Sequence, residues 1–272
     1  MKKIFTKLVV LFSLLIIGVL TASGCSTNAS NSDLKNEDSF SKIKERGYII
    51  MGLDDTFAPM GFKDEKGEIV GFDVDLAKEV FKRVGIEVKF QPIDWTMKES
   101  ELGAGNIDLI WNGYSINDER KEKVAFSKPY LENKQIIITL SGSDILSKEK
   151  LKDKNVAAQN GSSAIEAMNK EPDIVSLFKG GEPVVFDTNN EALMDLEAGR
   201  VDAFVGDEVL ARYYIKQRGA NKYNVLEDNF GKEEYGIGMR KQDKELVKQV
   251  DKALDDMRQD GTYERIYGKW FE

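Results

Sequence analysis

The stretch that decides the fold is GNIDLIWNGYSINDER, residues 105–120. Its first half predicts a buried strand, because Ile107, Leu109 and Ile110 are apolar and a Gly-Asn turn precedes them. Small and polar residues then lead to Arg120. Since ligands of open α/β sheets bind beyond the carboxyl ends of the strands, we expect a site here, with the Arg120 guanidinium gripping a small carboxylate. The alternative is that Arg120 lies on a solvated face of the charged run 118–123.

The residues around this stretch repeat a strand–helix alternation. We expect strands at 48–53, 86–92 and 107–110, a hairpin over 62–70, and helices at 40–46, 73–84 (capped by Asp73) and 96–102. The alternation predicts a parallel sheet with right-handed crossovers. The pattern begins again after residue 130, with strands at 135–140, 155–158, 182–186 and 201–205, and helices from 161, over 189–197 and over 207–215. A strand at 235–239 and helices over 243–258 and up to 270 end the chain.

Composition and charge narrow the class of protein. The 272 residues are 41% hydrophobic and 32% charged, as in soluble globular proteins of about two domains. The net charge of −8 argues against a nucleic-acid partner. The chain has no histidine, the commonest neutral-pH base and metal ligand, and a single cysteine, which excludes an intrachain disulfide. We therefore expect no cofactor and no metal.

Several segments together resemble one family. The central stretch and the following KVAFSKPY (residues 123–130) are similar to the polar amino acid binding proteins of bacterial ABC importers, the extracytoplasmic solute-binding proteins of family 3. Residues 52–59, 70–77 and 260–264 match in the same order, and the likeness covers about residues 40–272. The resemblance implies a two-lobed periplasmic-binding-protein (Venus flytrap) fold, in which two α/β domains are joined by a hinge near 131–134 and 226–231. Lobe 1 would comprise residues 39–132 and 228–272, and lobe 2 residues 133–227.

The N-terminus is expected to be a targeting segment. Three lysines precede an apolar run over 8–20, which is typical of a signal peptide over residues 1–24. Ala22-Ser23-Gly24-Cys25 resembles a bacterial lipobox, which implies that Cys25 is acylated and becomes the first residue of a lipid-anchored, extracytoplasmic protein. Residues 25–38, rich in Ser, Asn and Asp, would form a flexible tether. The alternative is an ordinary signal peptide with an incidental cysteine.

Two further elements supply chemistry complementary to Arg120. Gly161-Ser162-Ser163 offers hydroxyl and N–H groups at the start of a helix, which suits an anion. Asp207 offers a carboxylate to an ammonium, although it could simply cap the helix that follows. A cation that binds a carboxylate and a separate carboxylate that binds an ammonium together complement the two charges of an α-amino acid zwitterion. The resemblance assigns Arg120 and Ser162 to the α-carboxylate, Asp207 to the α-ammonium, and Gly113 and Ser115 to backbone and hydroxyl contacts.

The side chain of the ligand would be selected by the first lobe. Phe57 and Trp95 match the aromatic positions that sandwich the ligand side chain in the family; their alternative is ordinary core packing. Asp54 matches a position that reaches the polar end of that side chain, and a carboxylate there disfavours glutamate and aspartate. Glutamine, cystine, histidine, arginine and lysine stay open. The full predicted set is Asp54, Phe57, Trp95, Asn112, Gly113, Ser115, Arg120, Ser162, Ser163 and Asp207.

The function we expect is a binding protein that closes two lobes over a polar L-amino acid and delivers it to the permease subunits of an ABC importer. One alternative is an enzyme on the same scaffold, since some dehydratases resemble these receptors. Against it stands the absence of histidine and of a second cleft carboxylate suited to acid–base catalysis. Another alternative is a sensor that hands its ligand to a membrane receptor.

Overall fold

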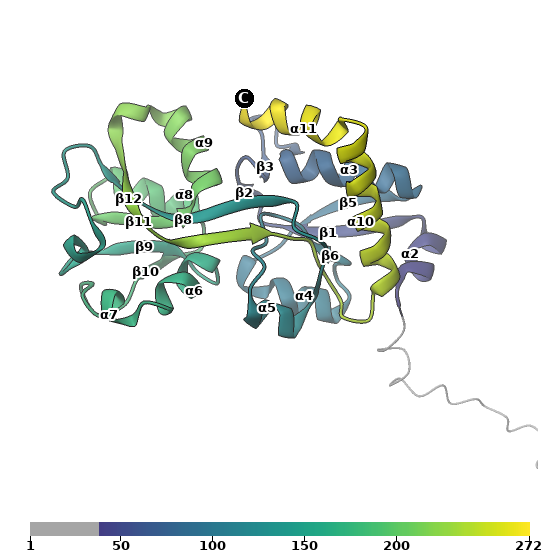
Figure 1. The fold of residues 1–272 in the computed structure, drawn as a ribbon, viewed down its shortest axis with the longest axis horizontal. Helices are drawn as coiled ribbons and strands as arrows, with labels where there is room; N and C mark the ends of the chain where they lie inside the picture. The colour runs from purple at the N-terminus through teal and green to yellow at the C-terminus, as the bar shows by residue number, and fades with distance from the viewer. Residues whose placement is uncertain (1–37) are drawn as a thin grey trace, which may run out of the picture. The chain divides into compact units, whose positions relative to one another are not determined.

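The structure is a computed structural model that describes residues 38–272, so the predicted signal peptide and Cys25 lie outside the described residues. Within them are two five-stranded sheets, ordered β5-β1-β6-β13-β7 and β10-β9-β11-β8-β12, and a three-stranded sheet β2-β3-β4. Each five-stranded sheet has its own helices, and β8 and β12 run between the two (Figure 1). Residues 38–272 therefore form two α/β lobes, as expected for a two-lobed binding-protein fold.

The first lobe contains both ends of the described chain. Its sheet consists of β1 (Tyr48–Leu53), β5 (Glu87–Pro92), β6 (Leu109–Ile110), β7 (Ala125–Phe126) and β13 (Gly238–Met239). The small sheet consists of β2 (Thr56–Phe57), β3 (Gly61–Lys63) and β4 (Ile69–Val70). On one side of the five-stranded sheet lie α3 (Phe72–Val84), α10 (Lys244–Gln259) and α11 (Thr262–Phe271), and on the other α4 (Lys98–Ala104) and α5 (Asp118–Lys123) (Figure 1). The short η2 (Trp95–Met97) precedes α4, and α2 (Phe40–Arg46) precedes β1.

The second lobe is inserted between β7 and β13. Its sheet consists of β8 (Leu131–Leu140), β9 (Val156–Gln159), β10 (Val184–Phe186), β11 (Ala203–Asp207) and β12 (Tyr223–Tyr235). Its longer helices are α6 (Ser163–Asn169), α8 (Asn189–Glu197) and α9 (Glu208–Arg218). Shorter turns of helix are η3 (Lys148–Leu151), α7 (Pro172–Val175) and η4 (Ala220–Lys222).

Both large sheets are mixed, which corrects the prediction of parallel sheets. β1 pairs in parallel with β5 and β6, and β9 in parallel with β10 and β11, as the strand–helix alternation predicts. β13 is antiparallel to β6 and β7, and β8 is antiparallel to β11 and β12. The prediction fails for β8 and β13 because each arrives from the other lobe without the crossover helix that a parallel connection needs.

The C-terminal residues return to the first lobe. β13 joins the first sheet, and apolar residues of α10 and α11 share a core with α3. Arg240, just after β13, fastens this return: its guanidinium donates to the Ile107 carbonyl at 2.8 Å and pairs with Asp108 at 3.1 Å and Asp243 at 2.8 Å. Within residues 38–272, no helix combines the length and apolar character needed to cross a membrane.

The second crossing between the lobes lies further along the chain than expected. β12 still pairs with β8 at Tyr235, opposite Leu131, so the predicted second hinge segment at 226–231 lies inside a paired strand and the sheet extends past residue 227. Residues on either side of Tyr235 bond to the central stretch: Ile116 N–H donates to the Glu234 carbonyl at 2.8 Å, and Gly236 N–H to the Tyr114 carbonyl at 3.0 Å. The central stretch is therefore held directly by the strand that leads back from the second lobe.

The start of α3 differs from the prediction that Asp73 caps it. The helix begins at Phe72 and its N-cap is Gly71, while Asp73 is fully buried inside the first turn. The Asp73 carboxylate accepts hydrogen bonds from Gly113 N–H at 2.8 Å and from the Tyr130 hydroxyl at 2.9 Å. Burial raises its pKa to about 7 despite these bonds. Asp73 thus anchors the central stretch rather than a helix end.

Candidate functional site

Arg120 lies in α5 with only 2% of its surface exposed. Its guanidinium donates to the Ser115 carbonyl at 3.2 Å and to the Gly161 carbonyl of the second lobe at 3.4 Å, and it pairs with Glu166 of α6 at 3.2 Å. The group also stacks 4.6 Å above the Tyr114 ring. The solvated-face alternative is therefore wrong: Arg120 is a buried cation between the lobes.

The Gly161-Ser162-Ser163 turn connects β9 to α6 and faces Arg120. Ser115 Oγ, in the first lobe, donates to Ser163 Oγ at 2.9 Å, and Ser163 Oγ also accepts from Gln135 Nε2 at 3.1 Å. Ser162 Oγ is buried without a protein partner. The turn approaches the first lobe closely, because a β-carbon added at Gly161 would lie 3.5 Å from Thr96 Cα. Serine hydroxyls from both lobes therefore meet next to the arginine.

Asp207 occupies the N-cap position of α9, but its side chain makes no capping bond. Instead its Oδ1 accepts from Asn133 Nδ2 at 2.7 Å, Gln135 Nε2 at 3.1 Å and the Tyr235 hydroxyl at 2.6 Å. Burial and the nearby Glu233 carboxylate raise the pKa of Asp207 well above its usual value. The capping alternative is thus wrong, and the carboxylate points toward the strands that join the lobes.

Asp54 and Asn112 meet where β1 and β6 end. Asp54 accepts from the N–H and hydroxyl of Thr56 at 2.9 and 2.6 Å, and from Gln159 Nε2 of the second lobe at 2.7 Å. Burial raises the pKa of Asp54, while the bonds from Thr56 and Gln159 oppose the shift. Asn112 Oδ1 accepts from Asp54 N–H at 3.0 Å, and its Nδ2 is buried without a partner.

The two aromatic candidates lie beside the central stretch. Phe57 is 6% and Trp95 8% exposed, and Trp95 packs edge-on against Tyr114 with ring centroids 5.9 Å apart. Gly113 has a φ of +56°, and a β-carbon there would come within 2.8 Å of the Phe57 ring, so glycine permits this ring to lie against the backbone. Because the Gly113 N–H already donates to Asp73, the contribution of Gly113 to the site is the space it leaves for the Phe57 ring.

All the predicted residues are buried, and several of them make contacts between the two lobes; together they are called the buried cluster. Hydrogen bonds or ion pairs join its two lobes at Ser115–Ser163, Asp54–Gln159 and Arg120–Glu166. Three buried side-chain atoms without partners belong to predicted residues: Arg120 Nε, Ser162 Oγ and Asn112 Nδ2. Buried polar groups that lack a partner are costly, so each of these atoms has hydrogen-bonding capacity that a polar ligand could use. Within the described residues, no three or more acidic, His or Cys side chains are grouped to hold a metal ion.

Comparison with known proteins agrees with this geometry. Residues 49–272 match the bacterial extracellular solute-binding proteins, family 3. The chain belongs to this family. It is 32% identical to the ABC transporter glutamine-binding protein of Bacillus subtilis, over 100% of this chain and 98% of that protein, and 34% identical to the lysine/arginine/ornithine-binding periplasmic protein of Escherichia coli, over 82% and 87%. A crystal structure of an ABC uptake transporter substrate binding protein from Streptococcus pneumoniae with bound histidine is 43% identical, with a TM-score of 0.84 over 86% of this chain and 96% of that one.

Sequence reasoning missed the polar side chains around Asp207 in this solute-binding protein. Asn133 and Gln135 share one face of β8, and this alternation in a strand was the available signal. Glu233 of β12 accepts from both amides, at 2.5 and 2.8 Å. The expectation of no second carboxylate near the cleft was therefore wrong. The pairing of β12 with β8, about a hundred residues away in sequence, is what brings Glu233 to Asp207.

Lys98 was also missed. It is 4% exposed, and its ammonium donates to the Trp95 carbonyl at 3.0 Å and to the Gly161 carbonyl at 3.1 Å. Burial, with the nearby Arg120 charge, lowers its pKa to about 8. Lys98 and Arg120 thus donate to the same carbonyl of the second lobe. A lysine in the first turn of a helix is normally solvated, so this role could not be predicted from the sequence.

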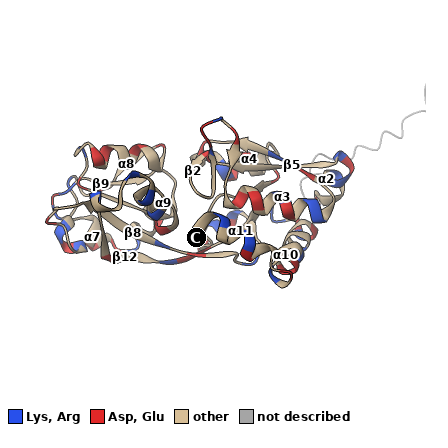
Figure 2. Ribbon diagram, turned by 90° about the horizontal axis from the view of Figure 1, so that it is seen from above, with Lys and Arg blue, Asp and Glu red and all other residues tan. Residues whose placement is uncertain are grey.

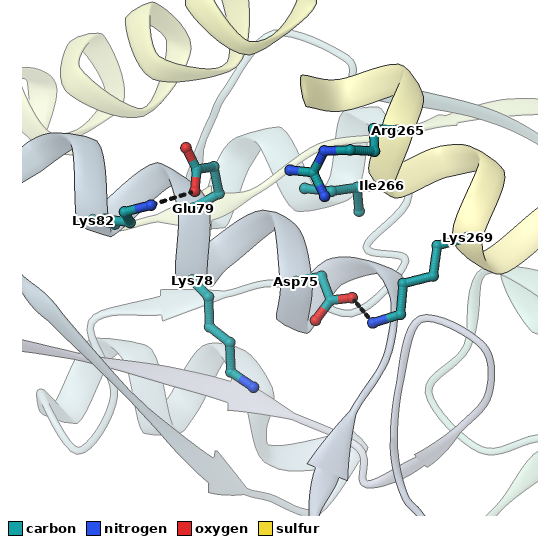
Figure 3. Close-up of a pocket in the computed structure, with 7 residues that line it drawn as sticks. All are labelled: Asp75, Lys78, Glu79, Lys82, Arg265, Ile266 and Lys269. Atoms are coloured by element: carbon teal, nitrogen blue, oxygen red, sulfur yellow. Dashed lines mark hydrogen bonds and ion pairs between the residues drawn. The ribbon is translucent and has the colours of Figure 1, made fainter. Parts of the chain in front are cut away.

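Residues of both charge signs are distributed along the helices of both lobes (Figure 2). A hollow of about 280 Å³ between α3 and α11 is lined by such groups (Figure 3). Two ion pairs occupy its walls, Lys82–Glu79 at 3.5 Å and Lys269–Asp75 at 2.6 Å. None of the predicted ligand-binding residues lines it, so the buried cluster between the lobes remains the candidate site.

Proposed function

We propose that the protein is the extracytoplasmic substrate-binding component of an ABC importer and binds a polar L-α-amino acid between its lobes. The observation that carries the proposal is the placement of a buried cation and a buried carboxylate on opposite lobes. Arg120 extends from the first lobe and Asp207 from the second, and the Ser115–Ser163 bond lies along the path of contacts between them. This polarity fits the carboxylate and ammonium of one zwitterion.

The side-chain end of the ligand would lie toward Asp54. Its carboxylate, Phe57 and Trp95 offer negative charge and aromatic surface, which suits a neutral polar or cationic side chain and repels an acidic one. The named ligands of the relatives above, glutamine, histidine and the basic amino acids, are compatible with this chemistry. We propose glutamine, cystine or a basic amino acid, bound in the closed state that the Asp54–Gln159 bond represents.

A thermal-shift screen of the twenty amino acids plus cystine and ornithine tests this proposal. A ligand at one hundred times its dissociation constant adds about 2.7 kcal/mol to the free energy of unfolding. We expect at least one neutral polar or basic L-amino acid to raise Tm, while its D-enantiomer, glutamate and aspartate do not. A screen in which no amino acid raises Tm would refute the proposal, and a preference for glutamate would refute the role given to Asp54.

We further propose that the protein does not convert its ligand. The relatives named above are binding proteins. Asp207 and Glu233 are nevertheless two carboxyl groups, capable of acid–base catalysis, next to the proposed ligand. The absence of ligand conversion therefore needs its own test. Stoichiometric protein and ligand, incubated for hours and analysed by mass spectrometry, should return the ligand unchanged. Formation of a product above a heat-denatured control would contradict the proposal.

Anchoring to the outer side of the cell membrane through a lipid on Cys25 is the remaining part of the proposal. It rests on the Ala22-Ser23-Gly24-Cys25 sequence. Cys25→Ala should shift the protein from the membrane fraction to the soluble extracytoplasmic fraction, and metabolic labelling with a fatty acid should be lost with it. Equal membrane association of parent and variant, without labelling of either, would show that no lipid is attached.

A further inference from the structure

Two carboxylates lie side by side at the end of the cluster that faces the strands between the lobes. Asp207 Oδ1 and Glu233 Oε1 accept from the same two amides, Asn133 Nδ2 at 2.7 and 2.5 Å and Gln135 Nε2 at 3.1 and 2.8 Å. Because both bonds end on one nitrogen, the two oxygens are at most about 5 Å apart. Four elements converge here, since Asp207 ends β11, the amides are on β8, Glu233 is on β12, and Ser163 of α6 lies 3.5 Å from Glu233.

The groups that hydrogen-bond to this pair or pack against its partners are neutral. From β8 come two amides, from β12 the Tyr235 hydroxyl, and from the first lobe the Tyr130 ring against Tyr235. The charged residues of the adjoining elements are engaged elsewhere: Glu208 of α9 with Lys134 and Arg212, and Glu166 of α6 with Arg120. Lys232 and Glu234 flank Glu233 in β12 and, with it, line a surface hollow of about 400 Å³. Within residues 38–272, no lysine or arginine forms an ion pair with Asp207 or Glu233.

Two like charges this close oppose each other's ionisation, and the burial of Asp207 adds to this effect, so the pair favours retention of one proton. A cation placed against Asp207 reverses that preference. We propose that Glu233 is a positioning residue that keeps a proton on the Asp207–Glu233 pair until the ligand ammonium binds Asp207, so that binding exchanges one cation for one proton. The inference rests on the function proposed above, and it adds that ligand affinity is coupled to pH.

The proton has a defined way out. Glu233 is partly exposed and lines the hollow beside the strands that join the lobes, whereas Asp207 is only 4% exposed. Solvent therefore reaches the pair from the side of Glu233, and a proton that leaves the pair has a short route to solvent there. Burial and the charge of Glu233 both raise the pKa of Asp207, in agreement with a proton held there before binding.

Isothermal titration calorimetry at pH 6 in phosphate and in imidazole, whose ionisation enthalpies differ, counts the protons released. The probe is L-arginine, or L-glutamine if arginine gives no heat, because neither side chain titrates between pH 5 and 8. The parent protein should release at least about half a proton per ligand, and its affinity should rise up to about tenfold per pH unit from 5 to 7. Glu233→Gln keeps a hydrogen-bonding group but removes the acid, so proton release should fall below about a tenth and the affinity should become nearly independent of pH.

Glu234→Gln is the matched control, since it changes the same charge in the next residue of β12 and should release as many protons as the parent. If Glu233→Gln does not fold, as judged by circular dichroism, Glu233→Ala removes the same acid while leaving Asp207 to bind the ligand, and it should likewise abolish release. Binding without proton release in the parent overturns the inference alone. Equal release by Glu233→Gln and the parent also overturns it and assigns the proton to Asp54, Glu166 or Lys98. Absence of binding heat with every amino acid overturns the proposed function and this inference together.

Discussion

Replacing Arg120 tests whether the buried guanidinium holds the ligand carboxylate through its fork shape or through charge alone. Arg120→Lys keeps the charge, whereas Arg120→Met removes it. Each charge-assisted hydrogen bond to the ligand contributes about 1.5–3 kcal/mol, so loss of a bidentate pair should cost about 3–6 kcal/mol, or about two to four decades in Kd. Lysine retains one such bond, so Arg120→Lys should weaken binding by about one to two decades.

The same contacts predict an effect on closure. In Arg120→Met the Gly161 carbonyl keeps only the Lys98 ammonium, and the half-buried Glu166 loses its ion pair at 3.2 Å. The pKa of Glu166, which burial already raises and Arg120 opposes, should therefore rise further. Loss of these contacts between the lobes should appear as faster ligand release as well as weaker affinity.

Calorimetric titration with the best ligand of the screen measures Kd for the parent and the two variants, and stopped-flow fluorescence measures the release rate. Arg212→Met is the matched control, because Arg212 pairs with Glu208 on the surface of α9 and should leave Kd unchanged. Circular dichroism and thermal melting without ligand establish that each variant is folded. Folded Arg120→Met with a Kd within about threefold of the parent would refute the assignment of the carboxylate end, and equal affinities of Arg120→Lys and the parent would refute the need for a fork.

Two further predictions concern stability. The pKa of Asp73 is about 7 in the folded protein, against an ordinary value of 3.8, so the folded state holds an extra proton between about pH 4 and 7. The free energy of unfolding of the parent, measured by urea denaturation, should therefore fall relative to that of Asp73→Asn as pH rises through this window, by up to about 4 kcal/mol. A difference between the two proteins that does not change with pH would contradict the shift. Arg240→Met leaves Asp243 buried without its cation and removes one of the ion pairs of Asp108. It should lower the free energy of unfolding by about 3–5 kcal/mol in the same assay. The control Lys248→Met, on the exposed side of α10, should lower it by less than about 1 kcal/mol.

Much of the local structure follows from the order of residues along the chain. The apolar run of β1 before the Asp54 loop, the hairpin between β3 and β4, and the helices α2 and α8 lie close to where periodicity and turn residues place them. Local hydrogen bonding and the burial of one face decide these elements, and both depend on residues that are close together in the sequence. The family resemblance could likewise be recognised from the sequence, because each of the segments that carry it is a contiguous run of residues.

Side-chain direction was settled only by tertiary structure. As a local feature, Asp207 before a helix is a good N-cap, and Arg120 in a charged run is a good surface residue. Strand pairing and lobe packing decided otherwise, by supplying Asn133, Gln135 and Tyr235 as donors to Asp207 and by covering Arg120 with Gly161 and Glu166. These partners are distant in sequence, so a local sequence pattern cannot predict them.

The sequence by itself indicated most of the helices and strands, the strand ends at which polar groups collect, and Arg120 and Asp207 as a candidate cation clamp and carboxylate. Only the tertiary structure decided that the sheets are mixed and that Glu233 lies beside Asp207. The physical reason is that hydrophobic periodicity specifies which face of a strand is buried but not which strand lies beside it. The choice of neighbour comes from the fit of whole surfaces, and here that choice placed a second acid at the proposed ammonium end of the site.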